Sequence, residues 1–435
     1  MRIALVRPSM SGVRAGDAMQ PLVFALLAAL TPSGVALTFH DELVEPLPEV
    51  PDADAVALTV ETFAARRAYQ LADRWRARGV PVIMGGFHPS MCPDEAAEHA
   101  DAVVVGEAED TWPRLLADLA AGRLASRYDS TCADGLGGVR FDTSVFAGKR
   151  YAPLGLVQFG RGCRFACDFC SIHAFFGARI RTRPVAEVVA EIARRPERML
   201  FFVDDNLYAD PAAARELLEE LVPLRRRFAC QLSMDVAGDP ALLRLLHRAG
   251  CRVVVVGFES TSPATLRAIG KGANLHADYE RVIRAFHAAR IMIYGTFVVG
   301  YDADSARTPA DAADFAIRHR FAVANFNPLM PMPGTRLYDR LKGQGRLIHD
   351  RWWIDPAYRY GDAMLVPTGM TPAELTDGCR AARFAFNTPA CIARRLAHPA
   401  ANAHSPANAA LFLAANLVSR REIRAKQGRR LGASG

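Results

Sequence analysis

Three cysteines, Cys163, Cys167 and Cys170, lie within the short segment GRGCRFACDFC. A disulfide needs two thiols, and a structural zinc site is normally filled by four ligands. Iron–sulfur clusters are held by cysteine thiolates, usually four, so three thiols would leave one iron of a [4Fe-4S] cluster open to another molecule. His173 follows Cys170 by three residues, so a zinc site of three cysteines and one histidine is the alternative.

Polar residues recur at or near the ends of apolar runs in the middle third of the chain, where we expect strands. They are Asp204, Asp205 and Asn206 after MLFFV, Gln231 and Ser233 within ACQLSMDV (229–236), Glu259 at the end of CRVVVVGFE, and Gly300 at the end of IMIYGTFVVG. In βα barrels the chemistry lies at the carboxyl ends of the strands. The cysteines follow the first such run, LGLVQFG (154–160), so we expect them at the same mouth.

The elements that would position these residues are βα units, and the fold class is α/β. Six units over residues 151–345 are fewer than the eight of a closed barrel, which predicts an open six-strand barrel. In residues 1–125, near-continuous apolar strands alternate with helices, which is typical of a doubly wound, Rossmann-like parallel sheet covered on both faces. Residues 126–150 form a Gly-rich linker, and residues 346–435 form a mainly helical C-terminal region with a basic tail.

The charge distribution, the lengths of the apolar runs and the number of cysteines exclude some classes of function. The net charge is +7, but residues 419–430 hold six Lys or Arg and one Glu, which leaves the rest of the chain nearly neutral. This argues against a nucleic-acid surface across the body. No apolar run is long enough to span a bilayer, and nine cysteines without even spacing do not suggest an oxidised scaffold, so we expect a cytoplasmic protein. The apolar run 409–418 and the basic tail suggest a peripheral membrane contact, with a solvated helix as the alternative.

Other residues are expected to have structural roles. The scattered cysteines Cys132, Cys230, Cys251, Cys379 and Cys391 are interpreted as core or incidental thiols. His88 and His99 are expected in surface or loop positions. Trp352-Trp353 are expected to pack the C-terminal helices, with the wall of a substrate pocket as the alternative.

The Cys-x3-Cys-x2-Cys spacing after the first barrel strand, with aromatic Phe169 before the last cysteine, resembles the radical S-adenosylmethionine (SAM) superfamily. The resemblance implies that SAM binds the open iron of a [4Fe-4S] cluster on Cys163, Cys167 and Cys170. One electron then splits it into methionine and a 5′-deoxyadenosyl radical. It also implies SAM contacts from Asp204, Asp205 and Asn206 to the amino group, from Gln231, Ser233 and Glu259 along the ribose and carboxylate, and from Gly300 to the adenine.

The block MGGFHPSMCPDEAAEHADAVVVGEAEDTWPRLL (84–116) is similar to the cobalamin-binding domain fused to many radical SAM proteins. The resemblance implies that Gly85 and Gly86 pass close to the cofactor, because glycine has no Cβ, and places Gly106 and Glu107 in the same site. No Asp-x-His-x-x-Gly motif is present, so no histidine of that motif would ligate the cobalt. A degenerate domain that binds no cobalamin is the alternative. The segment NFNPLMPMPGTRLYDRLKGQGRL (325–347) resembles the subgroup of hopanoid C-methylases and the anaerobic cyclase of the bacteriochlorophyll pathway.

The sequence therefore predicts a cobalamin-dependent radical SAM enzyme, a C-methyltransferase acting on an unactivated carbon of a small-molecule or lipid-like substrate. An electron donor such as flavodoxin or ferredoxin is implied as a partner, and nucleic acid is not. The alternatives are a radical SAM oxidoreductase or cyclase that uses cobalamin differently or not at all, and a non-catalytic binding protein on the same fold. A methylthiotransferase is disfavoured, because Cys92 stands alone before residue 125.

Overall fold

The structure, a computed structural model, describes residues 1–131 and 135–432 and forms two compact units. The first comprises Met1–Ala152, Arg351–Tyr360 and Arg429–Gly435, and the second comprises Pro153–Asp350 and Gly361–Gly428. Two short C-terminal segments thus belong to the N-terminal unit. The assignment of domain and linker boundaries at residues 125, 150 and 345 stays a prediction, and Cys132 lies outside the described residues.

A six-stranded parallel sheet forms the centre of the first unit. Its strands are β1 (Arg2–Arg7), β2 (Ala36–Asp41), β3 (Ala55–Thr59), β4 (Val82–Gly85), β5 (Ala102–Val105) and β6 (Arg127–Asp129). Their order is β2-β1-β3-β4-β5-β6, so the direction of winding reverses between β1 and β3. In open α/β sheets ligands bind outside the carboxyl ends of the strands at such a switch point.

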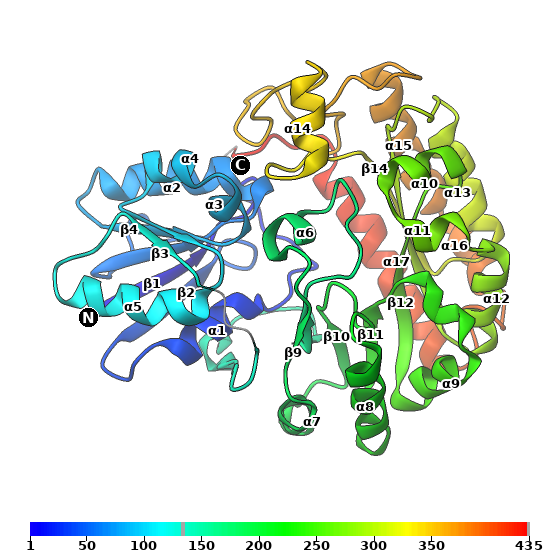
Figure 1. Cartoon of the computed structure of the whole chain (residues 1–435), viewed down its shortest axis with the longest axis horizontal. Coiled ribbons are helices and arrows are strands. Elements are labelled where there is room, and N and C mark those ends of the chain that lie inside the picture. Colours follow the sequence, from blue (N-terminus) through cyan, green and yellow to red (C-terminus); the bar gives the residue numbers. More distant parts are fainter. Residues whose placement is uncertain (132–134, 433–435) are drawn as a thin grey trace. The chain divides into compact units, whose positions relative to one another are not determined.

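Helices cover both faces of this sheet, which explains why its strands are apolar along most of their length. They are α1 (Leu22–Leu30), α2 (Ala65–Arg76), α3 (Phe87–Met91), α4 (Pro93–His99) and α5 (Ala108–Ala120). Figure 1 shows α2, α3 and α4 on one face and α1 and α5 on the other. Residues 3–6 of β1 are completely buried. This unit confirms the expected doubly wound, Rossmann-like fold.

The second unit contains a six-stranded parallel sheet in the order β14-β13-β12-β11-β10-β7. Its strands are β7 (Gly155–Val157), β10 (Met199–Phe202), β11 (Arg227–Gln231), β12 (Cys251–Glu259), β13 (Met292–Val299) and β14 (Val323–Pro328). This confirms the predicted six-strand partial barrel. The expectation that Ser233 lies within the third strand is wrong. The strand ends at Gln231 and a 3-10 turn, η4 (Met234–Gly238), follows, so Ser233 caps that turn instead.

The helices of the second unit pack on one face of its sheet and at its strand ends. They are α6 (Ser171–Phe176), α7 (Val185–Arg194), α8 (Pro211–Leu221), α9 (Pro240–Ala249), α10 (Pro263–Ile269), α11 (Gly272–Leu275), α12 (Tyr279–Ala288), α13 (Thr308–Arg318) and α14 (Arg336–Gly343). Two of these helices begin with an Asp–Pro pair, because Asp210 caps α8 and Asp239 caps α9 with Pro at the next position. Aspartate accepts from the free amides of the first turn, so these two residues set where each helix begins.

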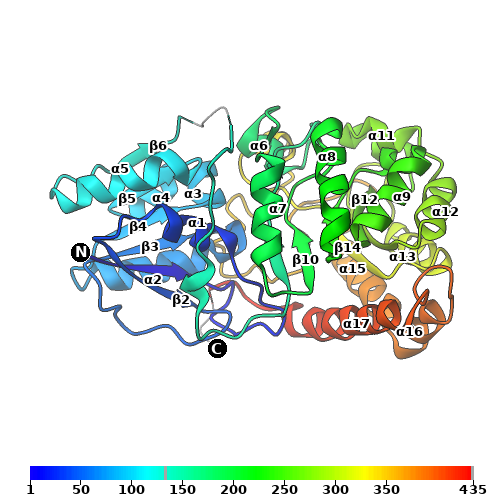
Figure 2. The same cartoon turned by 90° about the horizontal axis from the view of Figure 1, so that it is seen from below.

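Three C-terminal helices, α15 (Pro372–Phe386), α16 (Pro389–Leu396) and α17 (Pro406–Lys426), confirm the helical C-terminal region. Figure 2 shows α15 and α17 beside β14, the edge strand of the partial barrel, and α15 is also in contact with α13. Within the described ranges, no helix combines the length and the apolarity that a bilayer crossing requires.

Candidate active site

The three cysteines lie on a loop whose two ends are tied together. After β7 the chain forms β8 (Gly160–Arg161), which pairs antiparallel with β9 (Arg181–Thr182), so the loop between them carries all three thiols. Gly162 opens the loop with a φ of +91°, where a Cβ would lie 2.0 Å from the carbonyl oxygen of Arg179. Only glycine therefore fits at this position.

Two aspartates that follow β10 hold the backbone of this loop. Asp204 accepts hydrogen bonds from the amides of Phe159 (3.1 Å) and Gly160, and Asp205 accepts from the amide of Gly162 at 2.9 Å. Burial raises the pKa of Asp204 to about 7, against the lowering effect of these amides. Both oxygens of Asp204 accept amides of this loop, so Asp204 fixes the loop, and its contact with SAM stays a prediction.

The thiols fit the ligand set of an iron–sulfur cluster. Burial raises the pKa of Cys167 to about 12, Lys271 acts in the opposite direction, and Cys163 and Cys170 raise it further because they lie close by. Thiolate ligands need neighbouring positive charge, which the iron of a cluster supplies when bound. Among the residues that the structure describes, no three His, Cys, Asp or Glu side chains converge as they would on a single ion.

Asp168, between two of the cysteines, anchors the loop on its other side. Its carboxylate accepts from the hydroxyl of Tyr301 at 2.5 Å and pairs with Arg340 at 2.8 Å, and its carbonyl accepts from the amide of Leu337 at 3.0 Å. Sequence reasoning missed Tyr301 and Arg340, because both lie more than a hundred residues away. The only signal was the placement of a charged residue within the cysteine motif.

A buried ion pair lies at the carboxyl end of β12. Lys271 donates to Glu259 at 2.7 Å and to the carbonyl of Gly257 at 2.9 Å, and the side chains of Lys271 and Glu259 are 11% and 8% exposed. Glu259 has a φ of +63° and follows a register shift in the strand pairing, which turns its side chain out of the regular alternation. A Cβ on Gly257 would lie 1.9 Å from the Glu259 carboxylate. The ion pair therefore requires glycine there.

Hydrogen bonds connect several of the other residues that are predicted to contact SAM. Asn206 donates to the hydroxyl of Ser233 at 3.2 Å, and Gln231 donates to the carbonyl of Asp205 at 2.8 Å. Gly300, directly after β13, donates its amide to Asp304 instead of standing free. Phe169 packs on the apolar cluster around Cys167. Their individual contacts with SAM stay predictions.

The predicted cobalamin-contacting residues of the first unit lie at the carboxyl edge of its sheet. Gly85 ends β4, and its carbonyl accepts from the amide of Val60 after β3 at 2.8 Å. Ser90 links the two neighbouring loops, because its hydroxyl donates to the carbonyl of Gly86 at 2.7 Å and accepts from the amide of Gly106 at 2.9 Å. Glu107 is 7% exposed and begins α5.

The sequence suggested that His88 lies in a surface or loop position, and the structure shows that this is wrong. It is completely buried in α3, with Nε2 at 3.0 Å from the hydroxyl of Tyr69 and 3.2 Å from Glu95. Its Nε2 is thus engaged by Tyr69 and Glu95 within the first unit. The switch point between β1 and β3 and the glycine-bearing loops beside it fit a flat, bulky cofactor.

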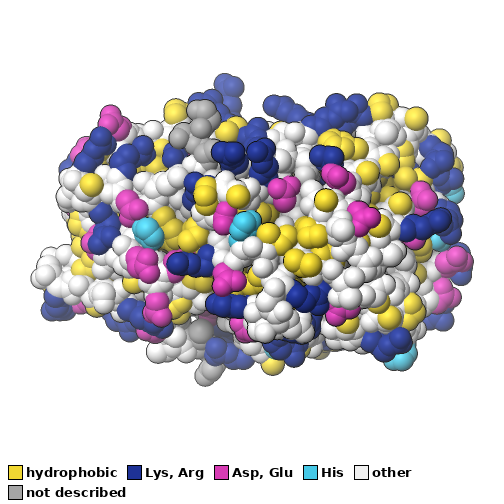
Figure 3. All heavy atoms as spheres, turned by 90° about the horizontal axis from the view of Figure 1, so that it is seen from above, with side chains coloured by type: hydrophobic (Ala, Val, Ile, Leu, Met, Phe, Trp, Pro, Cys, Tyr) yellow, Lys and Arg dark blue, Asp and Glu magenta, His cyan; other side chains and the backbone are white. Residues whose placement is uncertain are grey.

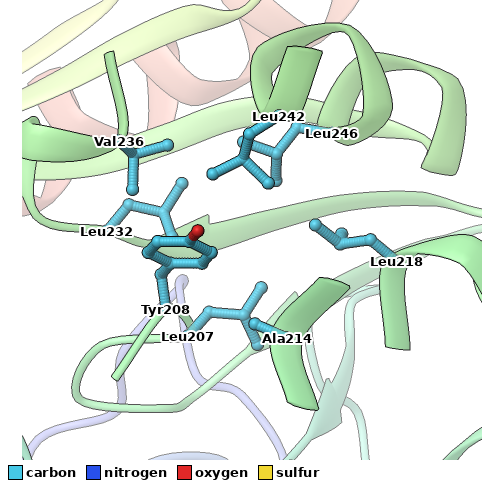
Figure 4. Close-up of a pocket in the computed structure, with 8 residues that line it drawn as sticks. All are labelled: Leu207, Tyr208, Ala214, Leu218, Leu232, Val236, Leu242 and Leu246. Carbon is cyan, nitrogen blue, oxygen red and sulfur yellow. The ribbon is translucent and has the colours of Figure 1, made fainter. Parts of the chain in front are cut away.

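The pocket drawn in Figure 4 belongs to the hydrophobic core. It is lined by Leu207, Tyr208, Ala214, Leu218, Leu232, Val236, Leu242 and Leu246. These residues come from α8, α9 and the segments that follow β10 and β11, and all except Tyr208 are apolar. The pocket therefore lies in the packing layer between the sheet and its helices and lacks the polar groups of the cysteine site.

Sequence comparisons place both units among known domains. Residues 157–316 match the Radical SAM superfamily and residues 29–116 match the B12 binding domain. The chain is 32% identical over 361 residues to bacteriochlorophyllide d C-12(1)-methyltransferase of Chlorobaculum tepidum, covering 80% of this chain and 79% of that protein. It is 28% identical over 353 residues to hopanoid C-2 methylase of Rhodopseudomonas palustris, covering 76% and 66%.

Solved structures share the fold. The radical SAM methyltransferase TsrM of Kitasatospora setae, with tryptophan and a SAM analogue bound, matches with a TM-score of 0.63 at 18% identity, covering 79% of this chain and 76% of that one. The cobalamin-dependent radical SAM enzyme OxsB matches with a TM-score of 0.54 at 14% identity, covering 88% and 61%.

The fold and the cysteine loop thus define a radical SAM enzyme with a cobalamin-binding domain. The chain belongs to the family of cobalamin-dependent radical SAM methyltransferases, and its cofactors are a [4Fe-4S] cluster, SAM and cobalamin. When bound, the cluster supplies one electron to SAM and cobalamin carries a methyl group.

Proposed function

We propose that this enzyme transfers a methyl group from SAM to an unactivated carbon of a small, largely apolar molecule. The observation that carries the proposal is the presence, in one chain, of a three-cysteine loop at a barrel mouth and a cobalamin-type sheet edge. Relatives named for methylation of a bacteriochlorophyllide and of a hopanoid support an apolar or lipid-like substrate.

The reaction consumes two molecules of SAM and two electrons for each methyl group transferred. One SAM loses its methyl group and leaves as S-adenosylhomocysteine. The other is split by one electron into methionine and a 5′-deoxyadenosyl radical, which takes a hydrogen atom from the substrate carbon and leaves as 5′-deoxyadenosine. The second electron balances the formation of the carbon–methyl bond.

The chain's own residues bind and orient the reactants in this proposal. Cys163, Cys167 and Cys170 hold the cluster, and Asp204 keeps their loop in place. Asp205, Asn206, Gln231, Ser233 and Glu259 surround SAM, with Gly300 beside the adenine and Phe169 beside the cluster. In the first unit Gly85, Gly86, Gly106 and Glu107 line the cobalamin.

A radical SAM cyclase or oxidoreductase is the second candidate function. The anaerobic magnesium-protoporphyrin IX monomethyl ester cyclase of Cereibacter sphaeroides is 25% identical over 377 residues, covering 78% of this chain and 60% of that protein. Both candidates predict 5′-deoxyadenosine, but only methyl transfer also predicts S-adenosylhomocysteine.

The test is to supply anaerobically reconstituted enzyme with SAM, reductant, hydroxocobalamin and candidate apolar substrates. Formation of both products, with a substrate mass increased by one methylene unit, is the expected result. Formation of 5′-deoxyadenosine without S-adenosylhomocysteine or a methylated product, in the presence of a substrate that is consumed, would refute methyl transfer and favour the cyclase.

A small acidic one-electron carrier protein of the flavodoxin or ferredoxin class is the proposed electron donor. Arg336 on α14 contacts the carbonyl of Ala166 in the cysteine loop, and Arg340 pairs with Asp168. Figure 3, seen from the side on which α14 lies in Figure 1, shows Lys and Arg side chains interspersed with Asp and Glu. We expect added salt to slow reduction by such a carrier while leaving reduction by dithionite unchanged, because salt screens surface charges.

The C-terminal helix α17 is the proposed point of contact with a membrane surface. Leu413, Leu417 and Val418 are 40%, 65% and 44% exposed, and Arg421 and Arg424 continue the same helix. An exposed apolar band beside basic residues is typical of helices that lie in anionic lipid interfaces. Co-sedimentation with anionic but not neutral vesicles is expected. The cytoplasm is the proposed compartment, which the free thiols among the described cysteines support.

A further inference from the structure

Residues 351–360 are distant in sequence from the first unit but form part of it. Trp352 and Trp353 are 0% and 2% exposed. The sequence suggested that they pack against the C-terminal helices, but their partners lie in the N-terminal unit. The chain therefore returns to the cobalamin-binding unit after completing the barrel. It returns again at residues 429–432.

These returning segments contact the loops after three strands of the sheet. After β1, the carbonyl of Met10 accepts from the amide of Gly432 at 2.9 Å. After β3, the ring of Phe63 lies 5.0 Å from Trp352 and 5.4 Å from Tyr360, measured between ring centroids. β1 and β3 flank the switch point, where the fold places its ligand.

After β4, the contact is made by the carboxylate of Glu95, whose side chain is 10% exposed. Glu95 accepts hydrogen bonds from the indole of Trp353 at 2.8 Å and from the hydroxyl of Tyr69 at 2.9 Å, and its other oxygen pairs with Arg351 at 3.3 Å. His88 lies 3.2 Å from the same carboxylate. Burial would raise the pKa of Glu95, but the hydrogen bonds outweigh it and lower the pKa to about 2. The carboxylate thus stays charged and keeps its partners.

Through Glu95, Trp353 fixes the segment that leaves β4. His88 follows Gly86 by two residues, and its amide donates to the carbonyl of Val60 at 3.1 Å, which ties the loops after β3 and β4 together. The ring of Trp353 also lies 5.5 Å edge-on from the ring of His88. Loss of the Trp353 indole would remove one hydrogen bond to Glu95 and leave the hydrogen bonds of the sheet unchanged.

We propose that the segment Arg351–Tyr360 is a built-in part of the cobalamin site, in which Trp353 is a positioning residue that sets the loop after β4. The inference rests on the proposed cobalamin contacts of this sheet edge. A segment outside the cobalamin-binding region of the sequence would then determine how tightly the enzyme holds its cofactor.

The first unit provides a matched control. Trp75 is also completely buried and also donates one indole hydrogen bond, at 3.0 Å to the carbonyl of Glu49. It lies at the end of α2, and Glu49 precedes β3, so this bond is at the amino edge of the sheet, away from the ligand edge. Trp75→Phe and Trp353→Phe therefore remove the same kind of bond from the same unit.

The experiment titrates hydroxocobalamin into the full-length protein and follows the absorbance spectrum, with cluster iron content and SAM affinity as parallel readouts. Trp353→Phe is expected to weaken cobalamin binding by about tenfold or more, with Trp75→Phe within about twofold of wild type. Iron content and SAM affinity stay unchanged in both. If Trp353→Phe does not fold, Arg351→Gln takes its place, with weakened cobalamin binding expected again.

Two results would overturn the inference: wild-type cobalamin affinity in the Trp353 or Arg351 variant, or equal weakening in Trp75→Phe, which would indicate a general loss of stability. Wild-type protein that binds no hydroxocobalamin would instead refute the cobalamin assignment itself, and this inference with it.

Discussion

At the level of single residues, the cysteine loop depends on the groups that hold its backbone as well as on its thiols. Asp204 and Asp205 receive its amides from one side, and Asp168 joins it to Tyr301 and Arg340 on the other. A cluster needs its ligands preorganised, because an irregular loop would otherwise lose much entropy when it binds.

Replacement of Gly162 by alanine is expected to disrupt this loop. Its Cβ would overlap the carbonyl oxygen of Arg179, and its φ of +91° is unfavourable for alanine. We expect bound iron and 5′-deoxyadenosine formation to fall to background. Gly177→Ala is the control, because Gly177 also has a positive φ but has nothing within 4 Å of the added Cβ. Equal iron content in the two variants would contradict the steric argument.

Lys271→Met tests the ion pair beside the cysteines. It leaves the Glu259 carboxylate buried without its partner, which costs about 3 kcal/mol of stability when a buried pair is broken. We expect SAM binding, measured by calorimetry, to weaken by about tenfold, equivalent to about 1.4 kcal/mol. Lys271→Arg should restore part of the affinity. Unchanged SAM affinity in Lys271→Met would show that Glu259 does not need the pair.

The sequence indicated some of these residues and could not indicate others. Thiols at fixed spacing and polar residues beside apolar strands are local patterns, so Cys163 and Asp205 were predicted. Lys271 and Tyr301 act through contacts made only in the folded chain, and no local pattern distinguishes them from surface residues.

At the level of elements, the edge strand β14 is closed by side chains of the C-terminal helices. Arg395 donates to the carbonyls of Phe321 and Ala322 at 2.8 and 2.7 Å, and Arg383 donates to that of Phe326 at 2.8 Å. An open edge can pair with another chain, and Arg383 occupies one acceptor of β14, while the two carbonyls that Arg395 binds directly precede the strand. The C-terminal helices are thus part of the barrel domain.

Arg395→Met is expected to destabilise the barrel unit by about 3 kcal/mol or more, because it leaves several buried oxygens without a donor. Arg395 is completely buried and also donates to Phe386 and Asn416. Its neighbour Arg394 is exposed on the same helix, so Arg394→Met should change stability by less than about 0.5 kcal/mol. Urea unfolding measures both, and similar midpoints would contradict this role.

Most strands were predictable because they are buried on both faces and read as continuous apolar runs. β6 was not, since it is three residues long, lies at the sheet edge and buries only Tyr128. The end of β11 was also missed, because apolar Leu232 and Met234 continue the pattern into the turn that follows.

At the level of the whole molecule, the order of segments in sequence differs from the grouping in space. From their position in the sequence, Trp352 and Trp353 were expected to pack against the C-terminal helices, yet they pack in the N-terminal unit. Burial of a tryptophan can be expected from its type, but the partner that buries it depends on how the chain returns, which no periodicity encodes.

Acid should destabilise the barrel unit through His287, which is partly buried. Burial lowers the pKa of His287 to about 4, and the nearby His398, His404 and His319 lower it further. Between pH 4 and 6.5 the unfolded chain binds more protons than the folded one, so stability is lost as the pH falls through this window. The loss from His287 is about 3 kcal/mol. His287→Phe should flatten the dependence of the urea midpoint on pH, and an unchanged slope would refute this source.

The central claim is that the loop of three cysteines holds a cluster that cleaves SAM. The most direct measurement compares iron content and dithionite-driven 5′-deoxyadenosine formation in anaerobically reconstituted wild type and in Cys163→Ala, Cys167→Ala and Cys170→Ala. We predict that wild type forms the product and that each variant binds less iron and forms none. Full activity in any one of the three variants would contradict this claim.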